Sequence, residues 1–370
     1  MPLFFLYNGF MKNIFLLLPL LTLFFMSPIS VFAQQSEESF RGVVEEIFEV
    51  PCSEVLEEGY VCFEYTVSIL DLKKEVRTIP ILSENGESRF LVGDSVYISY
   101  LTDGYDYESW SITGFVREGS ILFIVIIFSI VAVVIGRRQG LGSLISLAIS
   151  VLLLYLWAIP SILNGSDVIL IGIITVCISL VSIVYISHGF NIKSTIAILS
   201  TLVGVLIVAI LAKIFINLVH IDGSGSEEAF LLSSQTGGSA DLAGIFFVSI
   251  LIGAVGVLDD VVMSQVSAIQ ELLIANPNLT VKKLFSLAMN IGRDHISSMV
   301  NTLFIAYAGS SFALVILLTY NSGGVGSILR TDAIAEEIVR TFSASIGILL
   351  VVPITTFIAS YIIISNQSKQ

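Results

Sequence analysis

Ionisable and amide side chains are concentrated in one stretch of otherwise apolar sequence, from Gly253 to Gly309. The charged and carboxamide residues of this stretch include Asp259, Asp260, Gln270, Glu271, Asn290, Arg293, Asp294 and Asn301. Such groups are costly inside apolar segments and are usually kept there for a function. A carboxylate in that setting can carry a proton or bind a cation through its oxygens. These residues therefore predict a site for an ion or a polar solute.

Helical spacing sorts the polar residues into two stripes. The first consists of Gly253, Gly256, Asp260, Ser264, Ser267 and Glu271, and the second of Asn290, Asp294, Ser298 and Asn301, with Arg293 beside it. Two facing helices with these stripes could enclose a water-filled path. The candidate substrate or ion ligands are Asp259, Asp260, Ser264, Glu271, Asn290, Arg293, Asp294 and Asn301.

The segment between the stripes, Asn276 to Thr280, has the pattern of a helix stop followed by a helix start, with Thr280 as the N-cap. The expected result is a helical hairpin. A structural role is the alternative for its charges: Asp259 or Asp260 could lie at the level of the lipid headgroups, and Arg293 could pair with Asp294 to fix the hairpin. The clustering of the polar residues favours a functional site.

Familiar catalytic motifs are missing from the sequence. It contains no GxSxG, HExxH, SxxK or kinase signature, and the Gly-rich segment from Asn321 to Ser327 lacks the Lys of a phosphate-binding loop. The three histidines, His188, His220 and His295, lie far apart in sequence, which disfavours a metal site. We therefore expect neither an enzyme nor a metal or other cofactor.

Composition places the chain among polytopic membrane proteins. Of its 370 residues, 55% are hydrophobic and 13% charged, and the mean hydropathy is high. The segment 34–118 has eighteen acidic and six basic residues, and so carries −12 of the net charge of −13. This acidity argues against nucleic acid as a partner. The expected partners are the lipid bilayer and a small solute or ion of unknown identity, and a homo-oligomer is left open.

The chain begins with the layout of a secretory signal peptide over residues 1–33, and translation could start at Met11. An uncleaved N-terminal anchor is the alternative. Residues 34–118 then alternate apolar with polar side chains in five short runs, which predicts a small extracytoplasmic all-β domain, an OB-like or SH3-like barrel. Cys52 and Cys62 in this segment could form one disulfide or remain separate thiols.

Residues 119–370 form the expected membrane domain. Its seven apolar runs are long enough to cross a bilayer; they are 119–136, 141–163, 167–187, 194–219, 242–263, 297–320 and 336–365. If the β domain lies outside, nearly all the loop Lys and Arg lie inside, with Arg330 the exception. This distribution satisfies the positive-inside rule and places the C-terminus in the cytoplasm. The six spans after the first could be divided into two halves of three spans, and an inverted repeat needs an odd number of spans in each half.

Several segments together resemble the YibE/F-like family of bacterial multi-pass membrane proteins. They are GVLDDVVMSQVSAIQEL, NPNL, MNIGRDHISSMVNTLFIAYAG and RTFSASIGILLVVPIT, with an exported segment that ends in GDSVY and VRE. The resemblance covers most of the mature chain. It implies a location in the bacterial cytoplasmic (inner) membrane and, at most, a transport role, and it supplies no catalytic residue set.

Two functions remain in competition. The first is a secondary transporter or permease, with Asp260 and Asp294 as ion or proton sites and Arg293 as their partner. No nucleotide-binding signature is present, so an ion gradient would have to drive it. The second is a membrane scaffold or sensor that does not transport, in which the outer β domain binds a partner.

Overall fold

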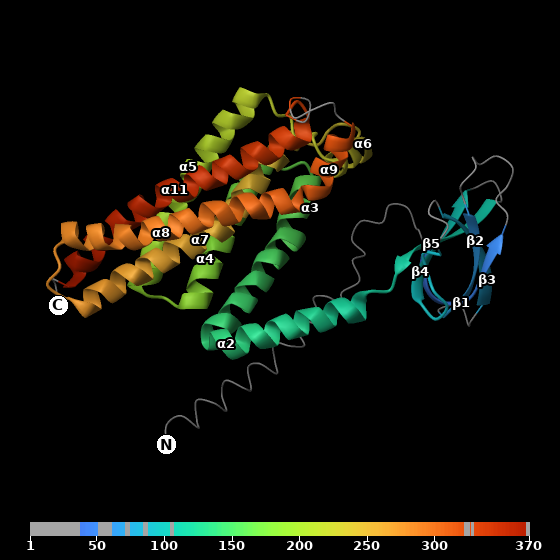
Figure 1. Cartoon of the computed structure of the whole chain (residues 1–370), viewed down its shortest axis with the longest axis horizontal. Coiled ribbons are helices and arrows are strands. Elements are labelled where there is room, and N and C mark those ends of the chain that lie inside the picture. The colour runs from blue at the N-terminus through green and yellow to red at the C-terminus, as the bar shows by residue number, and fades with distance from the viewer. Residues whose placement is uncertain are drawn as a thin grey trace, which may run out of the picture. The chain divides into compact units, whose positions relative to one another are not determined.

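The computed structural model describes residues 38–50, 61–70, 75–83, 88–103, 107–321, 326 and 329–367. It divides into two compact units, Met1–Ile130 and Val131–Gln370, which we call the β unit and the helical unit (Figure 1). The expected signal peptide lies outside the described residues.

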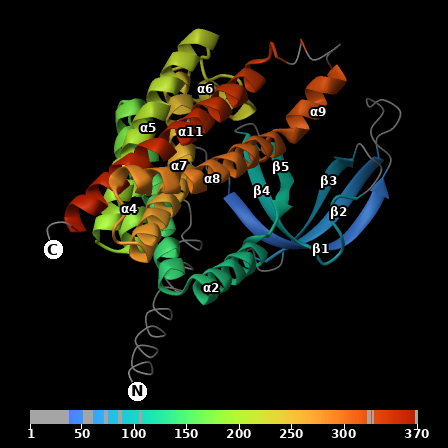
Figure 2. The ribbon, with the colours of Figure 1, turned by 60° about the vertical axis from the view of Figure 1, so that its left-hand side comes forward.

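The β unit is built on one antiparallel sheet of five strands. They are β1 (Glu38–Val50), β2 (Val61–Ile69), β3 (Glu75–Ser83), β4 (Ser95–Asp103) and β5 (Tyr107–Phe115), in the order β3-β2-β1-β4-β5. The long β1 pairs with both β2 and β4, and its register shifts between Val44 and Glu46. This bulge bends the strand (Figure 2), and the two edge strands β3 and β5 come into contact. The five strands expected from the alternating pattern are confirmed.

Every second side chain along the strands lies on the buried face of the sheet. Tyr65, Val67, Ile79, Val96 and Ile98 are at most 1% exposed, as expected when one face of each strand is buried. Cys62 of β2 is disulfide-bonded, and Cys52 lies outside the described residues.

The first turn of the following helix is held against the sheet. Tyr97 Oη donates a hydrogen bond to Glu118 Oε1, and Arg41 Nη2 lies 3.8 Å from the same oxygen. The Arg41 guanidinium also lies 5.8 Å from the centre of the Tyr97 ring. The hydrogen bond to the Glu118 carboxylate raises the pKa of Tyr97. These contacts fix the start of the helix to β1 and β4.

The helical unit consists of long apolar helices joined by short turns. In chain order the helices are α2 (Glu118–Leu153, which begins in the β unit), the π-helical turn η1 (Leu154–Ala158), α3 (Ile159–Leu163), α4 (Val168–His188), α5 (Ile192–Val219), α6 (Glu227–Gln235), α7 (Leu242–Ala275), α8 (Val281–Ser310), α9 (Phe312–Asn321) and α11 (Asp332–Gln367). Within the described residues, five helical segments are long and apolar enough to cross a membrane, or six if α8 and α9 form one bent span.

The expected spans correspond to these helices with two differences. The structure has one helical stretch of 46 residues, Glu118–Leu163, where the sequence predicts two spans. Its path is interrupted at Arg137, which has φ 50 and ψ −124. The helix α7 also continues to Ala275, beyond the expected end at residue 263, because charged residues do not stop a helix whose backbone hydrogen bonds remain intact. The expected stop at Asn276 and the Thr280 N-cap, which accepts from Lys283 N, are confirmed.

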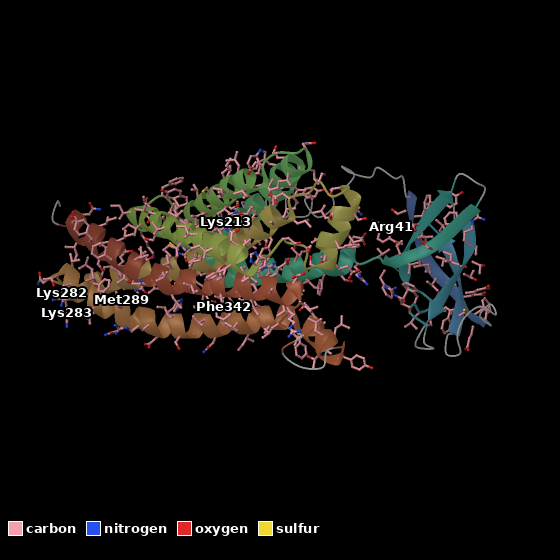
Figure 3. All side chains as sticks on the ribbon, turned by 90° about the horizontal axis from the view of Figure 1, so that it is seen from above. Arg41, Lys213, Lys282, Lys283, Met289 and Phe342 are labelled. Carbon is pink, nitrogen blue, oxygen red and sulfur yellow. The ribbon has the colours of Figure 1, made fainter. Side chains whose placement is uncertain are left out.

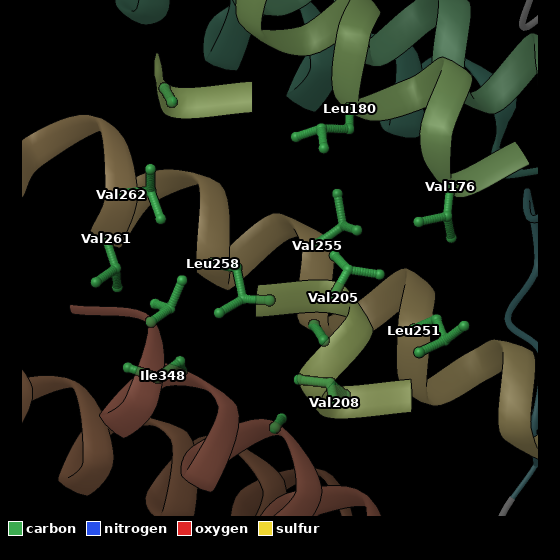
Figure 4. Close-up of a cluster of buried hydrophobic side chains, with 14 of the residues drawn as sticks. Val176, Leu180, Val205, Val208, Leu251, Val255, Leu258, Val261, Val262 and Ile348 are labelled. Atoms are coloured by element: carbon green, nitrogen blue, oxygen red, sulfur yellow. The ribbon is translucent and has the colours of Figure 1, made fainter. Parts of the chain in front are cut away.

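Three helices, α5, α7 and α11, meet at Gly204. A Cβ at this position would lie 2.8 Å from Val351 Cγ2 of α11 and 3.4 Å from Leu258 Cδ1 of α7. Around this point, apolar residues from α4, α5, α7 and α11 form a continuous buried cluster (Figure 4). The absent side chain therefore allows the close approach of three helices.

Substituting Gly204 with Ala is expected to destabilise the helical unit by about 1–3 kcal/mol, because Val351 must move to make room. Gly256→Ala is the matched control, since nothing lies within 4 Å of a Cβ built on this glycine of α7. Thermal unfolding of the detergent-solubilised protein measures both. Equal midpoints for the two variants would contradict the packing described at Gly204.

Candidate functional site

The helix that carries the two adjacent aspartates, α7, is at the centre of the helical unit. It packs against α4, α5, α8 and α11. The Asp241 side chain caps its N-terminus by accepting a hydrogen bond from Gly244 N at 2.9 Å. Contacts on so many sides place several faces of α7 away from the surface, so a polar residue on one of those faces is removed from solvent.

Asp259 is the buried carboxylate of this helix. Its side chain is 6% exposed, and its Oδ1 has no hydrogen-bond partner among the described residues. It directly follows Leu258, which lines the meeting point of three helices at Gly204. A buried carboxylate without a partner is unfavourable while charged unless a proton or a cation binds to it. Asp259 therefore has the surroundings of an ion-binding group.

Buried hydroxyl groups lie on the two neighbouring helices. The ones whose oxygens have no hydrogen-bond partner in the described structure are Ser194, Ser200 and Thr201 of α5 and Ser343, Ser345, Thr355 and Ser360 of α11. All seven are at most 4% exposed. Unpaired buried hydroxyls are uncommon. A hydroxyl oxygen can accept a hydrogen bond or ligate a cation.

The level of these hydroxyls along the bundle follows from the glycine contacts. Gly204 of α5 lies against Val351 of α11. Residues four apart share a helical face. Ser200 of α5 and Thr355 of α11 therefore lie one turn from Gly204 and Val351, towards the end of the unit where α5 begins. The helices α5 and α11 run antiparallel, since Gly347 in turn lies against Val208. Ser200 and Thr355 thus lie within about one turn of the level of Asp259.

Gln265 is a buried polar residue of α7 whose role the sequence did not reveal. It is 4% exposed, and its Nε2 donates to the Ala288 carbonyl of α8 at 3.0 Å and to Thr356 Oγ1 of α11 at 2.8 Å. It therefore ties three helices together. The only signal in the sequence was an amide next to the apolar Val266, on a helical face different from that of Asp260.

Asp260 and Ser264 lie on an exposed part of α7 and face two histidines. The Ser264 hydroxyl lies 3.4 Å from His295 Nε2 of α8 and donates to the Asp260 carbonyl at 2.8 Å. The imidazoles of His188 and His295 interact electrostatically with the Asp260 carboxylate. Residues that are distant in sequence, on α4, α7 and α8, are thus brought to one place.

The other expected ligands lie on exposed surfaces. They are Glu271 of α7 and Asn290, Arg293, Asp294 and Asn301 of α8. Arg293 Nη1 donates to Asn290 Oδ1 at 3.3 Å within α8. The face of α8 that packs inward is instead made by Leu284, Ala288, Gly292 and Leu303. The second polar stripe is therefore exposed, as are Asp260, Ser264 and Glu271 of the first.

A second charged network, absent from the predictions made from the sequence, occupies the start of α11. Glu336 is 6% exposed, and its Oε1 accepts a hydrogen bond from Gly225 N at 2.8 Å. Arg340 Nη1 lies 3.7 Å from Glu337 Oε2, and its guanidinium lies 5.4 Å from the centre of the Phe246 ring. Four charged residues in the first turns of α11, Asp332, Glu336, Glu337 and Arg340, were the available signal in the sequence.

The loop that supplies Gly225 is itself ordered by a short-range turn. Ser224 donates to Asp222 Oδ1 through its hydroxyl at 2.7 Å and its backbone N–H at 2.9 Å. The hydroxyl hydrogen bond, followed by the backbone one, lowers the pKa of Asp222. The turn therefore presents the Gly225 N–H to Glu336.

Within the described residues, no group of three or more His, Cys, Asp and Glu side chains is placed to hold a metal ion. A buried carboxylate and buried hydroxyls can bind a proton or a cation through their oxygens.

The long apolar helices and the polar residues buried among them define an integral, multi-pass membrane protein. The family model described as YibE/F-like protein matches residues 124–365, and the chain belongs to that family. The family membership predicted from the resemblance of the sequence segments is thus confirmed. Searches of curated proteins and of solved structures returned no match.

Replacing Asp259 with Asn is expected to raise the free energy of unfolding by about 1–3 kcal/mol, because a buried charge without a partner is removed. Asp260→Asn is the control, since Asp260 is exposed, and should change stability by less than about 0.5 kcal/mol. Thermal unfolding in one detergent compares them. Clear destabilisation by Asp259→Asn would mean that the carboxylate makes stabilising contacts.

Proposed function

We propose that this protein is an ion-coupled secondary transporter of the bacterial cytoplasmic membrane, with Asp259 as the ion-binding carboxylate and Asp260 beside it. The observation that carries the proposal is the buried Asp259 oxygen without a partner. A membrane protein keeps such a group at a cost in stability, and proton relays and ion pathways are the usual reason. The unpaired hydroxyls of Ser200 on α5 and Thr355 on α11 would supply further oxygen ligands at a similar level.

The proposal includes a chain that crosses the membrane seven times. The stretch Glu118–Leu163 has 46 residues and a length of about 69 Å at 1.5 Å per residue, roughly twice the hydrocarbon thickness of a bilayer. Its interruption at Arg137 supports two spans there. The α8 and α9 segments, bent by 59°, then count as one span.

The charge distribution supports an orientation with the β unit outside. Lys282 and Lys283 lie at the end of the helical unit where α8 begins (Figure 3). The same end carries Lys193 at the start of α5. The opposite end carries Glu227, at the start of α6. The positive-inside rule then assigns the lysine-rich end to the cytoplasm. The strand order and the contact between edge strands support an OB-like barrel for the β unit.

Ion coupling can be tested in liposomes that contain the full-length protein and an internal pH-sensitive dye. An imposed Na⁺ or K⁺ gradient is expected to change the internal pH only when the protein is present. Asp259→Asn should slow this exchange about tenfold or more, equivalent to at least about 1.4 kcal/mol in the barrier, because the amide cannot exchange a proton or bind a cation by charge.

Asp294→Asn is the matched control for this assay. It removes the same charge from an exposed position on α8, so it should leave the exchange rate unchanged. Exchange by Asp259→Asn at the wild-type rate, or the absence of exchange by the wild-type protein with both cations, would sink the ion-coupled assignment.

A sensor or scaffold is the second candidate function, because the β unit forms its own compact body. Its strands also carry an aromatic cluster. The ring centroids of Tyr100 and Trp110 are 4.8 Å apart, and the Arg77 guanidinium lies 5.3 Å from that of Trp110. Tyrosine, tryptophan and arginine are enriched where proteins bind one another.

Deletion of residues 34–117 separates the two functions. A transporter whose site lies in the helical unit should retain most of its ion exchange in the liposome assay, because Asp259 and its neighbours remain. Loss of all exchange, in a variant that still elutes as a folded species from a size-exclusion column, would favour a role in which the β unit governs the membrane helices.

A further inference from the structure

A cavity of about 440 Å³ opens where α4 ends and α5 begins. Its volume is within the range of small-molecule sites. Side chains from five helices, α2, α4, α5, α7 and α11, and from one turn contribute to its wall. The polar ones are Gln139, His188, Asn191, Lys193 and Gln270. Asp259 is not among the described residues that line this cavity, and none of those residues is acidic.

Several hydrogen-bond donors in the wall of the cavity are available to bind a ligand. The side chains of Lys193, Gln139 and Gln270 make no hydrogen bond or ion pair within the described part of the chain. Asn191, in contrast, is used by the protein: its Oδ1 accepts from Ser194 N at 2.8 Å and its Nδ2 donates to the His188 carbonyl at 2.8 Å. The wall thus combines a rigid turn with three unused donor groups.

The electrostatics of the cavity favour an anion. Lys193 supplies a positive charge, and the N-terminus of the 28-residue helix α5 begins at the same place and adds the positive end of its dipole. Arg137 and Arg138 precede Gln139 in the chain. The acidic group that faces this region is Asp260, which interacts with His188; it lies outside the lining of the cavity.

The surroundings of the cavity also suit the boundary between membrane and water. Phe190, in the turn between α4 and α5, is 86% exposed and stacks on Tyr185 with ring centroids 4.3 Å apart. Ile192 lines the cavity and is 53% exposed. Exposed aromatic side chains beside basic ones are typical of the interfacial region, and basic pockets between membrane helices bind anionic headgroups.

We propose that this cavity binds a phosphate-bearing group, held by the Lys193 ammonium and by the carboxamides of Gln139 and Gln270. The group can belong to a phospholipid headgroup or to a free phosphate compound, because both present the same tetrahedral anion to the donors. The proposal does not depend on transport, since it rests on the donors and charge of the cavity alone.

Binding is tested on the full-length protein in a neutral detergent, with dioctanoyl phosphatidylglycerol and inorganic phosphate as two separate probes in calorimetric titrations. Lys193→Gln is expected to weaken binding about tenfold through loss of a charge-assisted hydrogen bond. Lys193→Arg should retain most of the affinity. Lys213→Gln is the matched control, because it removes a charge from an exposed position of the same helix (Figure 3). Lys213 is not among the residues that line the cavity.

The two probes distinguish the sources of the phosphate group. Binding of the lipid alone assigns the cavity to a headgroup, whereas binding of inorganic phosphate as well assigns it to free phosphate compounds, and either result supports the proposal. If Lys193→Gln fails to fold, Gln270→Leu serves as the second variant and should also weaken binding. Absence of binding by both probes, or equal affinities for the cavity variants and Lys213→Gln, overturns the proposal.

Discussion

The close packing of α5, α7 and α11 at Gly204 is the contact on which the rest of the helical unit depends. Because no side chain separates these helices, Val351 and Leu258 both reach the α5 backbone. This approach places α7 in the interior, where it also contacts α4 and α8. Lipid does not drive apolar helices together as water does, so close van der Waals contact and a few interhelical hydrogen bonds must hold them. Gln265 makes two such interhelical hydrogen bonds, one to α8 and one to α11.

This packing gives the two neighbouring aspartates different surroundings. A rotation of about 100° per residue turns Asp259 into the packed interior and Asp260 towards His188 and His295. The buried carboxylate has a cost in stability, whereas the exposed one is close to groups that can carry positive charge. The proposed function uses Asp259 as an inner acceptor and Asp260 as an outer acceptor for a proton or a cation.

The polar stripes show how far a periodic pattern can be interpreted. The spacing of Asn290, Asp294 and Asn301 correctly indicates one face of a helix, and the structure leaves this face exposed. The inward face consists of small and apolar residues, among them Ala288 and Gly292, and a Cβ on Gly292 would lie 2.7 Å from Val352. Periodicity groups residues on a face, but it does not state which neighbour that face meets. The network of Glu336 and Arg340 was overlooked for the related reason that its partner, Gly225, is distant in sequence.

The sequence by itself determined the class of the protein, the positions of the five strands, most of the long helices, and the stop and cap at Asn276 and Thr280. These features depend on local hydrophobic period, capping chemistry and segment length, which can be read from neighbouring residues. Only the tertiary structure decided that Asp259 is buried, that Asp260 lies near two histidines, and that a cavity beside Lys193 has unused donors. Burial and proximity depend on which helices pack together, and that is set by contacts such as Gly204 with Val351 between residues far apart in the chain.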